Sequence, residues 1–183
     1  MILTDEAIRR LVDDSRITIR PFDAARLGPN WYDVSLGHQL AVIDSEEVDP
    51  RHPVENVVLD LPPEGLVLEP GLFYLGFVQE VLGSDHVVPL LHATKEAAER
   101  GLFVHVTANV IDIGNHANFS LHLVPTRRMR VRPGQVVARA SFWRVEGPVT
   151  LYKGKYKDAR GLAPSKSYLH FSDATGDRDR EGP

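Results

Sequence analysis

The chain has 183 residues, of which 43% are hydrophobic and 25% charged, a balance typical of one soluble globular domain. Its formal net charge of −4 gives no electrostatic support to non-specific binding of nucleic acid or of a membrane surface. The absence of cysteine excludes disulfide bonds, thiolate catalysis and cysteine-ligated zinc.

The N-terminal stretch predicts a helix and no targeting segment. Thr4 followed by two acids is typical of a helix start, and the helix is expected to end near Asp14. The stretch MILTDEAIRRLV lacks the basic and apolar regions of a signal peptide. No apolar run approaches the roughly 18 residues that a membrane span requires. We therefore expect a cytoplasmic protein that does not bind membranes.

Short β segments punctuated by Gly and Pro dominate the chain from residue 17 onward. They include ITI, YDVSLG, LAVI, VVLDL and FYLGFVQEVLG. Strands this short and this frequent predict an all-β barrel or sandwich rather than βαβ units. In VRPGQVVARASFWRV, a Pro-Gly turn precedes a strand expected to place Val136, Ala138, Ala140 and Phe142 on one face.

A second, short helix is expected over Thr94–Arg100, where charged residues surround three alanines at helical spacings. After Gly101 the pattern becomes β-branched and aromatic. One acid, Asp112, lies inside this apolar run. A buried carboxylate is costly unless something binds it, so Asp112 is a candidate site residue.

The last residues divide the chain into a domain and a tail. Residues 1–171 are expected to form a single domain. Residues 172–183, SDATGDRDREGP, are polar and Gly-containing, and we expect a flexible tail.

Five stretches of this chain, in the same order, resemble the dCTP deaminases of the trimeric dUTPase-like superfamily. They are MILTDEAIRRLVDDSRITIRPFD with LGPNWYDVSLGHQLAVI, LEPGLFYLGFVQEVL, GLFVHVTANVIDIG, RPGQVVARASF and YKGKYKDARGLAPSKSYLHF. The resemblance implies a distorted jelly-roll β-barrel and a homotrimer with its sites between subunits. It further implies zinc-free hydrolytic deamination of dCTP to dUTP, with Mg²⁺ bound through the nucleotide phosphates.

The resemblance implies a role for Asp112 and the residues before it. Asp112 matches the acid of the family's IDPG, which contacts the 3′-hydroxyl of the sugar, and Ala108, Asn109 and Val110 would hold the base. The alternative is that Asp112 caps the turn at Ile113–Gly114 through backbone N–H groups.

The chain departs from the family pattern at the phosphate-binding helix. Where the family has GRSSLAR, this chain has ATKEAAE, so that Lys95 is the only cation and Glu96 and Glu99 would repel phosphates. A site that keeps its sugar and base wall but loses this clamp is expected to favour nucleosides or monophosphates.

The water-activating glutamate of the family is replaced as well. The family's IVLEFYN corresponds to FSLHLVP, which places His122 at the general-base position; a purely structural His122 is the alternative. The family's PGWSG becomes IGNHA, which contains His116. His105, His116 and His122 lack the spacing of a metal site, so no protein-bound metal is expected.

The C-terminal segment keeps more of the family pattern. Tyr152, Lys155 and Tyr156 match residues that contact phosphates and pack on the nucleotide, whereas Ala159 replaces a glutamine that reads the base. The alternative is a solvated basic tail. The separate basic stretch RRMRVR is interpreted as an exposed strand edge rather than a nucleic-acid site, because it has no interleaved aromatic residues.

Two functions of different classes follow. The first is a dCTP deaminase-like hydrolase that binds a pyrimidine deoxynucleotide or nucleoside, with weak or lost deamination or a changed substrate. The second is a non-catalytic homotrimer that acts as a nucleotide sensor, regulator or scaffold. The combined loss of the motif Arg, both Ser, the Glu and the Gln favours a protein that has left the original chemistry.

Overall fold

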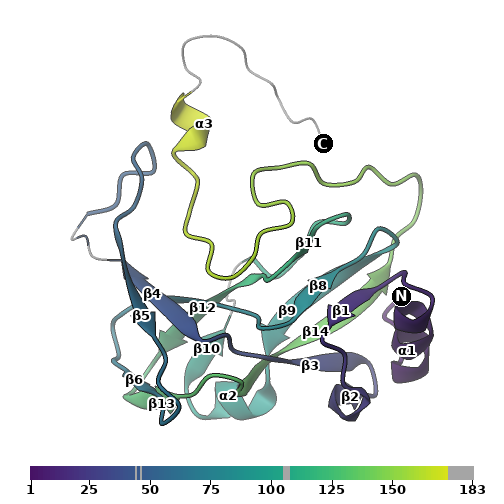
Figure 1. The fold of residues 1–183 in the computed structure, drawn as a ribbon, viewed down its shortest axis with the longest axis horizontal. Helices are drawn as coiled ribbons and strands as arrows, with labels where there is room; N and C mark the ends of the chain where they lie inside the picture. Colours follow the sequence, from purple (N-terminus) through teal and green to yellow (C-terminus); the bar gives the residue numbers. More distant parts are fainter. Residues whose placement is uncertain (44, 46, 105–107, 173–183) are drawn as a thin grey trace.

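A computed structural model describes residues 1–43, 45, 47–104 and 108–172, and most of their regular structure is β (Figure 1). Every strand pair in this part of the chain is antiparallel. In spatial order the four sheets are β1 (Thr18–Arg20), β8 (Val81–Gly83), β11 (His116–Ala117); β10 (Leu102–Val104), β12 (Ser120–Pro125), β7 (Tyr74–Phe77), β4 (Gln39–Ile43), β5 (Asn56–Asp60); β13 (Met129–Val131), β6 (Leu66–Leu68); and β2 (Leu27–Gly28), β3 (Trp31–Ser35), β14 (Val136–Arg144), β9 (Val87–Ala93). The mainly β class is confirmed, although none of the described sheets closes into a barrel.

The helices are few and short. α1 (Asp5–Asp13) begins after Thr4, carries acids in its first turn and buries Ile8 and Leu11. α2 (Lys95–Glu99) begins after Thr94, whose Oγ1 accepts a 3.1 Å hydrogen bond from the Ala97 N–H. Both predicted helices are confirmed. The remaining helical turns are η1 (Ala24–Arg26) and α3 (Leu169–Ser172), and no helix of the described residues has the length and apolarity to cross a membrane.

The sheets enclose one hydrophobic core, with the fully buried Tyr32 and Phe142 among its largest side chains. The alternation of β12 decides what reaches the outside of the five-stranded sheet. Leu121 and Leu123 are fully buried in the core, whereas His122 between them is half-buried on the opposite face. The core thus fixes β12 in a register that presents His122 outward.

The face predicted for β14 is partly wrong. Ala138, Ala140 and Phe142 are fully buried as expected, but Val136 is exposed and its neighbour Val137 is buried instead. The pairing of β14 with β3 shifts register between Val136 and Ala138. This irregularity exchanges the two faces at the start of the strand.

A buried carboxylate joins β3 to the connection between β7 and β8. Glu80 is 1% exposed and accepts hydrogen bonds from the Ser35 N–H at 3.0 Å and the Ser35 hydroxyl at 2.5 Å. The Arg26 guanidinium donates to the same carboxylate and neutralises its charge. Because its oxygens are satisfied inside the protein, Glu80 is a structural residue.

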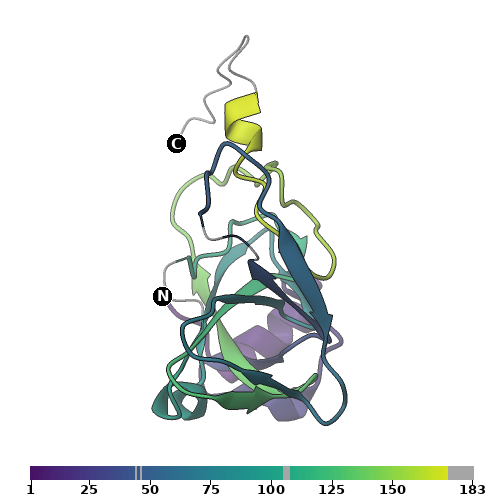
Figure 2. The same ribbon diagram turned by 90° about the vertical axis from the view of Figure 1, so that its left-hand side faces the viewer.

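The C-terminal residues 152–171, here called the closing segment, lie above the sheets and lead into α3 (Figures 1 and 2). The Ser167 hydroxyl donates a 3.5 Å hydrogen bond to the Pro50 carbonyl in the loop between β4 and β5. The closing segment therefore reaches from the end of β14 to the far edge of the five-stranded sheet. The tail predicted to be flexible falls at 173–183, outside the described residues.

Candidate functional site

A cavity of about 390 Å³ lies between the outer face of the five-stranded sheet and the closing segment. Its walls are mostly apolar. The polar side chains that line it are Asn56, Asp112, Asn115, Asn118, Ser120, His122, Tyr152, Tyr156 and Ser165. Among the described lining residues Asp112 is the only carboxylate, and none is Lys or Arg. Such a cavity suits the uncharged part of a ligand.

His122 forms part of the sheet wall of this cavity. It pairs with Leu75 of β7, and its ring lies 5.6 Å from the ring of Phe73 at an interplanar angle of 34°. Burial lowers the pKa of His122 below its ordinary value of 6.5, because desolvation disfavours the imidazolium. At neutral pH the imidazole is uncharged, so it offers one donor and one acceptor nitrogen to the cavity region.

Asp112 lines the cavity but is exposed rather than buried, so the expectation of a buried carboxylate is wrong. The residue lies just before the turn at Ile113–Gly114, where water reaches it. Its backbone carbonyl accepts a 3.2 Å hydrogen bond from the Asn115 N–H. Within the described residues its carboxylate has no hydrogen-bond or ion-pair partner, which gives no support to the turn-capping alternative.

The residues before Asp112 form a second wall that is attached to β9. Ala108 and Val110 line the cavity, whereas Asn109 does not. The Leu91 N–H donates a 2.9 Å hydrogen bond to the Asn109 carbonyl, and Leu90 forms an isolated bridge with Val110. Asn109 therefore contributes its backbone to the position of this wall. His105 falls within 105–107, outside the described residues.

Lys95 does not line the cavity, because α2 lies at the opposite side of the molecule from the closing segment (Figure 1). Its ammonium pairs with Glu99 of the same helix at 3.5 Å. Glu96 lies 3.7 Å from the guanidinium of Arg139 in β14. Each acid of α2 thus has a cation of its own chain nearby.

Arg139 is the centre of this second charge cluster. Its Nε donates a 2.9 Å hydrogen bond to Asp33, and its guanidinium lies 4.3 Å from the centroid of the Trp31 ring. The combination fixes the guanidinium between β3, β14 and α2.

The closing segment supplies the aromatic wall and the nearest cations. Tyr152 and Tyr156 line the cavity, but Lys155 does not. The ammonium groups of Lys155 and Lys166 lie 5.6 Å and 5.8 Å from the centroid of the Tyr156 ring. Lys155 also contacts the imidazole of His170 in α3. Neither lysine has a carboxylate within ion-pair distance in the described part of the chain.

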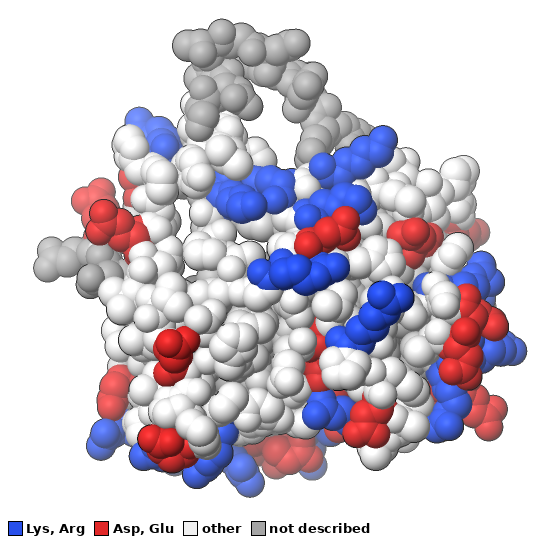
Figure 3. Space-filling view, in the orientation of Figure 1, with Lys and Arg blue, Asp and Glu red and all other residues white. Residues whose placement is uncertain are grey.

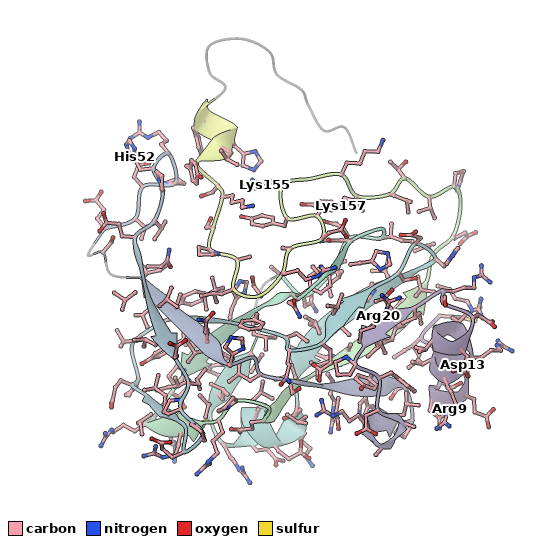
Figure 4. All side chains as sticks on the ribbon, viewed as in Figure 1. Arg9, Asp13, Arg20, His52, Lys155 and Lys157 are labelled. Atoms are coloured by element: carbon pink, nitrogen blue, oxygen red, sulfur yellow. The ribbon has the colours of Figure 1, made fainter. Side chains whose placement is uncertain are left out.

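Lys and Arg side chains gather on the face that carries the closing segment (Figure 3). Figure 4 shows Lys155 on this segment beside α3 and Lys157 farther along it. Lys157 donates a 2.7 Å hydrogen bond to the Gly114 carbonyl, so its ammonium is already used within the fold.

His116 lies outside the cavity and has a structural arrangement. Its Nδ1 lies 3.0 Å from the Thr18 hydroxyl, and its Nε2 lies 3.0 Å from a carboxylate oxygen of Asp85. The ring thereby links β11 to β1 and to the loop before β9. The described residues contain no group of three His, Asp or Glu side chains that could together hold a metal ion.

The sequence reasoning missed Asn115 and Asn118, which are 5% and 9% exposed and line the cavity. A signal was available. Polar amides in the turn after Asp112 need buried partners, and backbone groups of a closing segment can supply them. The partners themselves could not be identified without the fold.

Comparisons with known proteins agree with this geometry. The model of the dCTP deaminase-like family matches residues 2–145. A protein of Clostridium beijerinckii named "dCTP deaminase, dUMP-forming" is 34% identical over 172 residues, which cover 93% of this chain and 99% of that protein. One of Cytophaga hutchinsonii with the same name is 38% identical over 158 residues, 86% of this chain and 91% of that protein.

A solved structure shares the fold. The crystal structure of 2′-deoxycytidine 5′-triphosphate deaminase from Agrobacterium tumefaciens superposes with a TM-score of 0.63 at 20% identity. The match covers 79% of this chain and 48% of that one. At this identity the likeness supports the fold alone.

Proposed function

The chain belongs to the dCTP deaminase-like family, and from that premise we propose that its cavity binds a pyrimidine deoxynucleotide. The family reaction is hydrolytic deamination of dCTP to dUTP. We propose that this reaction is weak or lost here, or that the nucleotide substrate has changed.

The observation that carries this proposal is the lining of the cavity. His122 stands on the sheet wall where the resemblance implies a water-activating glutamate, and the one carboxylate among the described lining residues is the exposed Asp112. A neutral imidazole can accept a proton from water. It cannot form the carboxylate arrangement that the family uses to move protons to the base and to the leaving amine.

The placement of the nucleoside follows from the same walls. Asp112 is proposed to contact the sugar, because its carboxylate is exposed at the cavity and has no partner in the described residues. Ala108 and Val110, with the backbone of Asn109, would form the wall beside the base. Tyr152 would pack on the nucleotide from the closing segment.

The closing segment is proposed to hold the phosphates. Lys155 and Lys166 flank Tyr156 at the cavity, whereas the acids of α2 are neutralised by Lys95 and Arg139. This arrangement reverses the expectation that nucleosides or monophosphates bind best, because both reasons behind that expectation are weakened. A substrate contact of Lys95 would require the cavity of a neighbouring subunit.

Mg²⁺ is proposed to enter with the phosphates. The described residues provide no cage of acidic or imidazole ligands, and a hard cation bound to a triphosphate needs few protein ligands. Within the site the metal would neutralise phosphate charge. No zinc is proposed.

A homotrimer is proposed as the assembled form, with the sites between subunits. Val110, Phe103 and Phe73 are 60%, 50% and 40% exposed, and two of them line the cavity. Apolar surface that continues from a cavity is suited to cover by another subunit. Light scattering should give three times the monomer mass at micromolar concentration, and a monomer mass would refute the assembly.

A non-catalytic nucleotide sensor, regulator or scaffold is the second candidate. The observation in its favour is that the side chains replacing the family's phosphate-binding motif form ion pairs within the chain.

One experiment separates the two candidates. Purified protein is incubated with dCTP and Mg²⁺ while ammonia and nucleotide products are measured, and a thermal-shift panel of nucleotides is run in parallel. A raised Tm without ammonia release indicates binding without deamination. A panel in which no nucleotide raises the Tm would contradict the nucleotide site itself.

A further inference from the structure

The closing segment is hydrogen-bonded along its length to the turn and strand that follow Asp112. The main chain contributes two bonds, from the Tyr152 N–H to the Ile113 carbonyl at 2.8 Å and from the Asn118 N–H to the Ala159 carbonyl at 3.0 Å. Side chains of the closing segment add two more, from Lys157 to the Gly114 carbonyl and from Arg160 to the His116 carbonyl, both at 2.7 Å.

Two buried amides complete this attachment. Asn115 Oδ1 accepts a 3.0 Å hydrogen bond from the Asp158 N–H, and Asn118 Oδ1 accepts a 3.2 Å bond from the Gly161 N–H. The two asparagines are 5% and 9% exposed. Leaving such a buried acceptor or its donor unpaired would cost free energy, so each amide favours the attached position of the segment.

Asn118 also connects the closing segment to the sheet below. Its Nδ2 donates 3.0 Å hydrogen bonds to the carbonyls of both Val78 and Gln79, in the connection between β7 and β8. The same side chain therefore holds Gly161 on one side and the end of β7 on the other. Few side chains could replace it, because it acts as donor and acceptor at once.

Gly114 shows how closely the two backbones approach. Its φ is +91°, and a Cβ at this position would lie 2.7 Å from the Leu151 Cβ. A side chain would be strained in this conformation and would separate the closing segment from the turn. Backbone contact of this kind keeps the segment in one position.

We infer that Asn115 and Asn118 are positioning residues that hold the closing segment against the cavity before a ligand binds. All of these bonds join groups of the same chain, so none depends on contacts from a nucleotide. The wall that carries Tyr152 and Tyr156 is then preorganised, and a ligand does not have to order the segment at a cost in affinity. The identity of that ligand rests on the proposed function, but the attachment does not.

Amide hydrogen exchange resolved by residue tests the attachment in the full chain without nucleotide. The amides of Asp158 and Gly161 should exchange at least about tenfold more slowly than in an unstructured peptide. Exchange at the unstructured rate in the free protein, with protection only after nucleotide is added, would overturn the inference. This measurement uses the wild-type protein and needs no variant.

A matched pair of variants tests the acceptor itself. Asn115→Leu keeps the shape but removes the oxygen, whereas Asn115→Asp keeps an oxygen for the Asp158 N–H. The leucine variant should speed exchange at Asp158 while amides in β7 and β12 keep their protection, and the aspartate variant should restore slow exchange. Equal exchange at Asp158 in both variants and the wild type would refute the role of Asn115.

The consequence for binding is measured by calorimetry with dCTP and Mg²⁺. Asn115→Leu should weaken binding by on the order of tenfold, and Asn115→Asp should bind nearly as the wild type does. Loss in both variants would show that the amide contacts the ligand directly, which contradicts a positioning role. Absence of dCTP binding to the wild type would refute the proposed function, while the exchange result would still decide the inference.

Discussion

Two charged regions of this protein, α2 and the closing segment, use their charges differently. In α2, Lys95 pairs with Glu99, and Glu96 faces Arg139. In the closing segment, Lys155 and Lys166 flank an aromatic ring that lines the cavity, with no carboxylate nearby in the described residues. Charges neutralised within a chain are poor ligands for phosphate, whereas cations without a carboxylate partner can bind one.

The difference shows why replaced motif residues are a poor guide to lost binding. Glu96 and Glu99 would repel a triphosphate if they acted as isolated charges. Their pairing removes most of that repulsion and makes α2 part of the structure around β14. The role of a binding region can then move to another segment of the same fold.

The largest expected effect concerns catalysis. Because the cavity presents His122 in place of a water-activating carboxylate, deamination of dCTP should be lower by on the order of 10² to 10⁴ than in an enzyme with the glutamate. Ammonia release with dCTP and Mg²⁺ measures this rate. Turnover near a typical kcat of about 1 s⁻¹ or above would contradict the account, and His122→Ala would then be the first variant to test.

A second prediction separates the structural charges from the ligand-facing ones. Arg139→Met leaves Asp33 and Glu96 without their cation and removes the contact with Trp31, so the free energy of unfolding should fall by about 1–3 kcal/mol. The matched variant Lys155→Met should change it by less than about 0.5 kcal/mol. Urea unfolding monitored by fluorescence measures both. A large loss with Lys155→Met and none with Arg139→Met would reverse the comparison.

The sequence predicted much of the fold because local patterns decide it. The capped, acid-rich starts of α1 and α2 and the frequent short strands determine these elements without distant contacts. The irregularity after Val136 was missed, since it depends on pairing with β3 rather than on the composition of β14.

The candidate site was predictable only in part. His122, Asp112, Ala108, Val110 and Tyr152 come together at one cavity, as the resemblance implied. The exposure of Asp112 depends on what surrounds the turn and could not be read from an apolar run. The pairing of Glu96 with Arg139 joins residues far apart in the sequence, so no local pattern could reveal it.

A smaller effect concerns pH and the sheet wall of the cavity. Burial lowers the pKa of His122, and burial together with the nearby Arg139 lowers that of His92. Each imidazole binds fewer protons in the folded than in the unfolded protein, so stability is fully present above pH 6.5 and falls as the pH drops below that value.

The change His122→Gln tests this dependence. The variant should lose stability less steeply than the wild type between neutral pH and the lowered pKa of the histidine. Thermal melts across this pH range measure the slope, with His116→Gln as a control whose pH slope should stay that of the wild type. A steeper loss in His122→Gln than in the wild type would show that the imidazolium is favoured in the fold.

The comparison of the two regions is tested most directly by calorimetry of dCTP with Mg²⁺ on two single variants. Lys155→Ala should weaken binding by about tenfold, since a charge-assisted contact to phosphate contributes on the order of 1.5–3 kcal/mol. Lys95→Ala, in which only an exposed pair with Glu99 is lost, should bind as the wild type does. Weaker binding by Lys95→Ala together with unchanged binding by Lys155→Ala would contradict the account and place the phosphates on α2.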